Sequence, residues 1–168
     1  MRYLEEEDLP VIFDLIGQYY CENEEVPDYR SEANGIEKLQ GIFQGVREDV
    51  YYPSLLEKAV YLFVQINKGH FFSNGNKRLS LVCGIGFLGI NDIGLDSAVS
   101  KETYRELFEI LFPYKFEMED QADFTSDEFA LYNLAIFIAD SSRFGISFDD
   151  LKERVHKFLS RMSIPVKY

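Results

Sequence analysis

Two apolar stretches on either side of a polar loop are the feature that most constrains the fold of this 168-residue chain. Residues 55–67 read LLEKAVYLFVQIN and residues 79–90 read LSLVCGIGFLGI. Both stretches are apolar on nearly every face of a helix, which is typical of helices buried in a core. Between them, residues 69–78 read GHFFSNGNKR. Two core helices need only a short turn to connect them, so these polar side chains require a functional explanation.

The rest of the chain also carries the signals of helices. No stretch alternates apolar and polar residues for long enough to predict a strand, whereas helix start and stop signals recur over the whole length. Ser54 with Glu57 three residues later predicts a capping box, and Gly69 predicts the end of that helix. We therefore predict an all-α bundle with the polar loop between two buried helices. The expected helices cover about residues 8–21, 35–48, 54–69 and 76–90, then one from Ser100 to before Pro113, one opened by Thr125 with Glu128, and one opened by Ser147 with Asp150 and ending before Pro165.

Two segments do not fit this helical pattern. Residues 21–35, CENEEVPDYRSEANG, are polar and long for a helix connection, which predicts either a loop or a short hairpin. Residues 113–124 are acidic and are expected to be exposed. Neither segment has the composition of a linker, so we expect one domain over residues 1–168.

Charge and composition exclude several functions. The chain has 17 Lys and Arg against 29 Asp and Glu, a net charge of -12, which argues against binding nucleic acid and favours a protein partner with a basic surface. No apolar run reaches the length of about 18 residues that a membrane span needs, and the N-terminus does not read as a signal peptide, so we expect a cytoplasmic protein that does not bind membranes. Cys21 and Cys83 each lie in an apolar helical context and are expected to be reduced core thiols.

The polar loop has the composition of an anion site with a base beside it. Gly75 and Asn76 open the second apolar helix, and the free N–H groups at such a start bind phosphate. Lys77 and Arg78 add positive charge, although cations at this end of a helix oppose its dipole. His70 follows the end of the preceding helix, so a tight turn brings its imidazole toward the same space. A group that takes a proton near neutral pH would then face a bound phosphate chain, a layout that activates a hydroxyl.

Each of these features alone has a structural explanation. A single histidine is usually structural, a Gly-Asn turn between helices is common, and Phe71 and Phe72 are expected to anchor the loop in the core. The joint spacing of these residues favours the functional interpretation.

Residues 70–78, His-Phe-Phe-Ser-Asn-Gly-Asn-Lys-Arg, resemble the signature of the Fic/Doc family, H-x-F-x-(D/E)-(G/A)-N-(G/K)-R. The likeness covers about residues 50–95 well and the remainder weakly. It implies an all-α Fic/Doc-like bundle that transfers part of a nucleoside triphosphate, with Mg²⁺, to a Ser, Thr or Tyr hydroxyl of a target protein. The resemblance also implies a flap that docks the target upstream of the motif, where residues 21–35 lie.

The resemblance assigns a role to each residue of the motif. His70 would be the general base, Phe72 would anchor the loop, and Gly75 and Asn76 would form the anion nest. Lys77 and Arg78 would bind the phosphates of ATP or another triphosphate. Asn74 stands where the family has an acidic Mg²⁺ ligand, and a neutral amide oxygen holds Mg²⁺ less strongly than a carboxylate.

A second departure from the signature bears on the reaction. Leu81 stands where AMP-transferring members with a Gly-Arg ending carry another Arg, and Lys77 stands in their Gly position. The chain therefore looks more like Doc, the death-on-curing toxin branch that phosphorylates, with AMP transfer as the alternative. A catalytically weakened module that binds a nucleotide or a protein is an alternative of another class. A metal-dependent hydrolase has little support, because the second histidine, His156, lies in a separate C-terminal helix.

Regulation can be examined through the same resemblance. Many family members silence themselves with a helix of the pattern (S/T)-x-x-x-E-(G/N), but no Ser or Thr of this chain has a Glu four residues later. We therefore expect control by a separate, antitoxin-like partner rather than by an acidic side chain of the chain itself.

Overall fold

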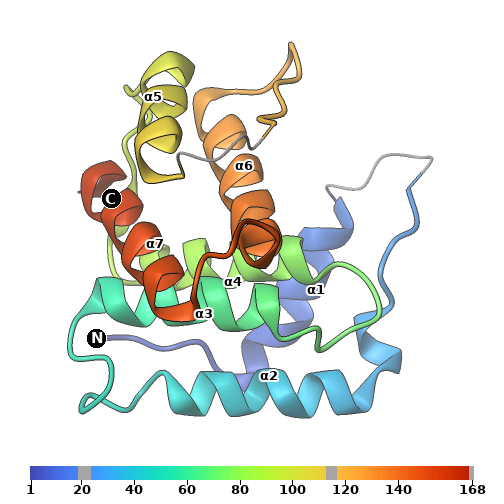
Figure 1. Cartoon of the computed structure of the whole chain (residues 1–168). Coiled ribbons are helices and arrows are strands. Elements are labelled where there is room, and N and C mark those ends of the chain that lie inside the picture. Colours follow the sequence, from blue (N-terminus) through green and yellow to red (C-terminus); the bar gives the residue numbers. More distant parts are fainter. Residues whose placement is uncertain (19–23, 113–116, 167–168) are drawn as a thin grey trace. The chain divides into compact units, whose positions relative to one another are not determined.

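The structure is a computed structural model that describes residues 1–18, 24–112 and 117–166. These residues form seven α-helices, three short 3-10 helices and two three-residue strands (Figure 1). The predicted all-α class is confirmed. The α-helices are α1 Leu9–Gln18, α2 Ala33–Gly45, α3 Leu55–Lys68, α4 Asn76–Ile90, α5 Lys101–Leu111, α6 Ser126–Asp140 and α7 Phe148–Met162. The other elements are η1 Glu6–Asp8, η2 Tyr29–Ser31, η3 Ser141–Phe144, β1 Ile93–Leu95 and β2 Ser163–Pro165.

Four helices, α3, α5, α6 and α7, begin at the capping residues that the sequence predicts, whereas α2 covers residues 33–45 instead of the expected 35–48 and begins without a side-chain cap. Ser54 Oγ accepts a hydrogen bond from the Glu57 N–H at 3.2 Å, and the Glu57 carboxylate accepts one from the Ser54 N–H at 2.9 Å. Thr125 and Glu128 form the same reciprocal pair at the start of α6. Ser100 and Ser147 cap α5 and α7 through their side chains. Each cap satisfies a backbone donor that the first turn of a helix leaves without a partner, which fixes the starting residue.

The described residues divide into two compact units, residues 1–91 and 92–168. In the first unit α3 and α4 run side by side (Figure 1). Leu62, Phe63 and Ile66 on α3 are fully buried, as are Leu79 and Phe87 on α4. The two apolar stretches therefore form buried helices, as predicted, and the polar loop connects them.

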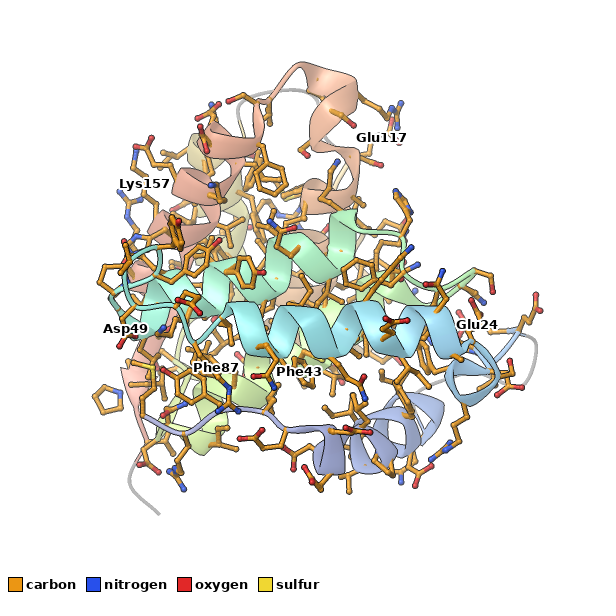
Figure 2. All side chains as sticks on the ribbon, turned by 90° about the horizontal axis from the view of Figure 1, so that it is seen from below. Glu24, Phe43, Asp49, Phe87, Glu117 and Lys157 are labelled. Carbon is orange, nitrogen blue, oxygen red and sulfur yellow. The ribbon has the colours of Figure 1, made fainter. Side chains whose placement is uncertain are left out.

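A buried lysine ties α3 to the end of α2. Lys58 is fully buried, and its Nζ donates to the Val46 carbonyl at 2.7 Å and lies 2.9 Å from the Asp49 carboxylate. Figure 2 shows Asp49 beyond the C-terminal end of α2, and Phe43 on this helix is buried. Positive charge at the last carbonyls of a helix is favourable, so this contact holds the C-terminal end of α2 against α3.

The second unit contains α5, α6, α7 and a small antiparallel sheet. Ile93, Gly94 and Leu95 of β1 pair with Pro165, Ile164 and Ser163 of β2. Strands of three residues are too short for alternation to be visible in the sequence, which is why they were not predicted. The core of this unit is aromatic: the Phe108 ring stacks on Phe158 at 5.2 Å and meets Phe137 edge to face at 4.8 Å.

The remaining sequence expectations have mixed outcomes. The described part of residues 21–35 holds η2 and the start of α2, so the hairpin alternative is wrong for these residues. Residues 117 and 119–123 are exposed, as expected.

Cys21 lies outside the described residues, whereas Cys83 is fully buried. Burial raises the pKa of the Cys83 thiol, which keeps it unreactive. None of the helices formed by the described residues has the length and apolar character that a membrane crossing requires.

Candidate active site

The loop between α3 and α4 has an unusual backbone at both of its ends. His70, directly after the C-cap Gly69, has a φ of 49°, and Gly75, the N-cap of α4, has a φ of 79°. The left-handed region costs a glycine nothing but is uncommon for other residues. The chain thereby reverses direction between two buried helices and leaves His70 exposed to solvent. We call residues 69–75 the motif loop.

Asn76 braces the motif loop from the first residue of α4. Its Oδ1 accepts a hydrogen bond from the Phe72 N–H at 3.1 Å, and its Nδ2 donates to the Phe72 carbonyl at 2.7 Å. The Phe72 side chain is buried, and its ring meets Tyr29 edge to face at 5.0 Å. Phe72 is thus a core anchor of the loop, and the side chain of Asn76 is committed to the loop's shape.

Residues 24–35, which we call the cover segment, lie against the motif loop. The Tyr29 hydroxyl donates to the Gly75 carbonyl at 2.8 Å. A Cβ on Gly75 would collide with Tyr29 and Pro27, and one on Gly35 would lie 2.6 Å from the Phe71 carbonyl oxygen. Both glycines are therefore required by the close approach of the cover segment to the loop.

Glu32 accepts two hydrogen bonds from Ser73. Its carboxylate accepts from the Ser73 N–H at 2.9 Å and from the Ser73 hydroxyl at 2.7 Å. These are charge-assisted hydrogen bonds, which are stronger than neutral ones. They fix the turn of the chain directly before Asn74 and Gly75.

Two further contacts reach the polar end of the motif. Arg78 Nη2 lies 2.9 Å from the Glu24 carboxylate, and Asn74 Nδ2 donates to the Glu25 carbonyl at 3.2 Å. Figure 2 shows Glu24 beyond the end of α2 at which that helix begins. An acidic side chain of the chain itself therefore contacts the motif arginine.

The start of α4 favours an anion. Gly75 has no side chain to cap the helix, and the first intrahelical donor is the Leu79 N–H, which bonds the Gly75 carbonyl at 3.0 Å. The N–H groups of Asn76, Lys77 and Arg78 precede it, at the positive end of the helix dipole. Lys77 is exposed and adds a cation there. A phosphate at this position would meet backbone donors and positive charge together.

The structure brings the predicted site residues together in one loop and helix start. His70, Phe72, Asn74 and Gly75 belong to the motif loop, and Asn76, Lys77 and Arg78 to the first turn of α4. His156 lies on α7 in the other unit and Leu81 on α4. Sequence reasoning missed the contacts of Glu24, Tyr29, Glu32 and Gly35 with the motif. The signals for this segment were the unusual length and polarity of residues 21–35 and the flap that the family resemblance implies there, and neither named these contacts.

No curated protein sequence matches the chain. The model of the Fic/DOC family, however, matches residues 4–88 of the 168. This range contains the motif loop, the whole of α3, α4 as far as residue 88 and the cover segment. The match agrees with the predominantly helical structure. The chain belongs to the Fic/DOC family.

Proposed function

We propose that the protein transfers the γ-phosphate of ATP to a Ser, Thr or Tyr hydroxyl of a target protein. Membership of the Fic/DOC family indicates a transferase that modifies proteins. The observation that carries the finer proposal is the start of α4, where a glycine N-cap without a side chain, Lys77 and Arg78 follow an exposed histidine in one short loop. ATP as the donor is consistent with the cytoplasmic location expected from the sequence.

In this proposal each group of the motif has one role. The imidazole of His70 would take the proton of the target hydroxyl. The hydroxyl oxygen would then form a bond to the γ-phosphorus while the bond from that phosphorus to the β-phosphate oxygen breaks, so that ADP leaves. Lys77, Arg78 and the N–H groups of the first turn of α4 would stabilise the charge on the phosphates. Preorganised charge of this kind is usually the largest contribution to catalysis.

Asn74 is the residue that fits a bound Mg²⁺. Its Nδ2 donates to the Glu25 carbonyl, so its Oδ1 is the atom that can act as a hard, neutral ligand. Mg²⁺ would supply positive charge to the nucleotide phosphates. One neutral ligand is a weak site by itself, and the phosphates would supply most of the remaining oxygens.

The choice of phosphate depends on how the nucleotide lies along the loop. Leu81 cannot contact a phosphate, whereas Lys77 adds a cation directly at the start of α4. This distribution of charge favours transfer of the γ-phosphate over transfer of AMP. We propose AMP transfer by the same site as the alternative.

A second candidate function has its own support. The ion pair between Arg78 and Glu24 places a competing carboxylate on a residue that would bind phosphate. Together with the neutral Asn74, it favours a catalytically weakened module that binds a nucleotide or a protein without turnover. The pair also bears on regulation. The Glu24 carboxylate would compete with the nucleotide for Arg78, in addition to any inhibition by an antitoxin-like partner.

The test is labelling of a host lysate with ATP that carries the label on the γ or the α position. We expect the γ label, and not the α label, to mark a target protein. The reverse result would assign AMP transfer, and no label from either nucleotide would leave the binding module.

The matched control for labelling is a variant of His70. His70→Ala should lower the rate by about 10²- to 10⁴-fold, the usual contribution of a general base. Because His70 has a left-handed backbone, His70→Asn is the second variant, since Asn tolerates that region better than Ala. Full labelling by both folded variants would show that His70 is not the base.

A further inference from the structure

A cavity of about 380 Å³ lies between α1 and residues 26–30 of the cover segment. This volume is in the range of sites that take small ligands or a protruding side chain. The side chains that matter for its chemistry are two aromatic rings, two apolar groups and two carboxylates, those of Phe13, Tyr29, Val26, Pro27, Asp14 and Asp28.

The cavity shares a wall with the motif loop. Tyr29 lines the cavity, and its hydroxyl donates to the Gly75 carbonyl. Pro27 also lines the cavity and packs against Gly75. An extended chain advances by about 3.3 Å per residue. Because Tyr29 and Pro27 belong to both walls, one target segment can reach both the cavity and the motif loop.

One wall of the cavity already holds a guanidinium of the chain itself. The Arg30 side chain lies 5.8 Å from the centroid of the Phe13 ring, 2.7 Å from the Asp14 carboxylate and 3.2 Å from the Pro10 carbonyl. The rings of Phe13 and Tyr29 stack at 4.9 Å. An aromatic face beside a carboxylate is a favourable place for a cation.

Asp28 supplies the charge for a second cation. Both hydrogen bonds that Ser31 donates to Asp28 end on its main-chain carbonyl, at 3.2 Å and 2.9 Å, so these contacts leave the carboxylate uncommitted. The charge of Arg30 is balanced by Asp14, whereas no cation among the described residues forms an ion pair with the Asp28 carboxylate. Val26, which also lines the cavity, is 53% exposed and offers an apolar surface for the stem of a long side chain.

We propose that this cavity takes an arginine or lysine side chain of the target protein, close to the hydroxyl that is modified. The inference rests on the proposed function, because it names the chemistry of the target at the same site. The motif loop with the start of α4 and the cavity then carry opposite charges. Lys77 and Arg78 attract the nucleotide, whereas Asp28 and the exposed Glu25 attract a cation and repel phosphate. A basic target segment would be oriented by this difference.

Peptide binding to the full chain tests the proposal without turnover. The probes are fluorescent Gly/Ala peptides with a central serine and one arginine, moved one position at a time, and matched peptides with citrulline, which is similar in shape but neutral. We expect the best arginine peptide to bind about threefold to tenfold more tightly than its citrulline partner at low salt, with a smaller difference at high salt. Since no reaction is needed, the preference can hold even if the transferase activity fails.

Two variants with the same change of charge locate the preference. Asp28→Asn should remove most of it, whereas Asp123→Asn, an exposed aspartate of the other unit, should leave it unchanged. Equal binding of the arginine and citrulline peptides would overturn the proposal, and so would a preference that survives in Asp28→Asn. Self-association of the chain that Asp28→Asn abolishes would instead assign the cavity to a second copy.

Discussion

Arg78 is held by a carboxylate of its own chain before any nucleotide arrives. A phosphate that binds Arg78 must compete with Glu24, whose carboxylate lies 2.9 Å from Nη2. Both side chains are partly exposed, so the pair is weak and can be displaced. At the proposed nucleotide site Glu24 would thus compete with phosphate for Arg78. Glu24 does not belong to a helix with the sequence pattern of self-silencing family members.

Glu24→Gln should therefore bind ATP more tightly than the parent chain. Exposed ion pairs contribute about 0.2–1 kcal/mol, which corresponds to an affinity gain of up to about fivefold. Titration calorimetry with ATP and Mg²⁺ measures the change. Glu25→Gln is the matched control, because it removes a neighbouring charge while its contact with Asn74 uses the main-chain carbonyl. An equal gain in both variants would mean that general charge, and not the pair with Arg78, sets the affinity.

Asn74→Asp should increase the affinity of the nucleotide complex for Mg²⁺, because a carboxylate adds charge to a hard cation. The same change removes the donor that bonds the Glu25 carbonyl. We therefore expect the Mg²⁺ concentration at half-maximal nucleotide binding to fall, at some cost in stability. An unchanged Mg²⁺ requirement would show that residue 74 is not a ligand. Activity that appears only in this variant would support the weakened-module candidate.

At the scale of elements, the site depends on how closely α2 approaches the motif loop. Gly35 lies in the first turn of α2, where a Cβ would meet the Phe71 carbonyl and the Phe72 ring. Gly41 lies further along the same helix with no atom within 4 Å of a Cβ. One helix thus contains a glycine that is required by packing and another that is not.

Gly35→Ala should destabilise the protein and weaken nucleotide binding, since the added methyl group displaces the motif loop. Overpacking of this kind costs about 1–3 kcal/mol. Gly41→Ala should instead stabilise the protein by about 0.5–1 kcal/mol, because alanine is the better helix former. Urea unfolding and ATP titration of both variants check this pair. If Gly35→Ala behaves like Gly41→Ala, the loop does not depend on the contact with α2.

At the scale of the whole molecule, the stability has a pH dependence that arises in the second unit. Burial raises the pKa of Asp127, and the charges of Asp96 and Glu128 raise it further. Burial also raises the pKa of Tyr104, to about 12, with smaller contributions from the negative charges of Asp127 and Asp96. The ionised form of Asp127 is thus less favourable in the folded protein than in the unfolded chain.

The sign of the effect follows from proton binding. With a raised pKa, the folded state holds more protons than the unfolded state, so stability falls as pH rises from the unfolded value of about 3.9 through the folded pKa. Asp127→Asn should therefore be more stable than the parent chain at pH 7, and the difference should vanish near pH 3. Unfolding by urea at several pH values measures it. Asp123→Asn carries the same change of charge on an exposed loop and should show a smaller difference.

Local contacts explain why so much of the fold could be predicted from the sequence. Ser54, Ser100 and Thr125 cap their helices through residues three positions away, and such contacts depend only on neighbouring residues. The buried character of α3 and α4 and the position of the motif loop follow from composition in the same way. The expectation of a single domain stays a prediction, as do the catalytic roles of the motif residues.

The contacts that shape the site were decided only by the tertiary structure. Glu32 reaches Ser73 across 41 positions of the sequence, and Glu24 reaches Arg78 across 54. The two β-strands, 70 positions apart, likewise pair only because the fold closes the second unit. Contacts at this range depend on how helices pack. The rings of Phe13 and Tyr29, from α1 and the cover segment, both contact the Phe72 ring of the motif loop. The motif therefore determined which groups could act, and packing determined which of them are already bound to the protein's own side chains.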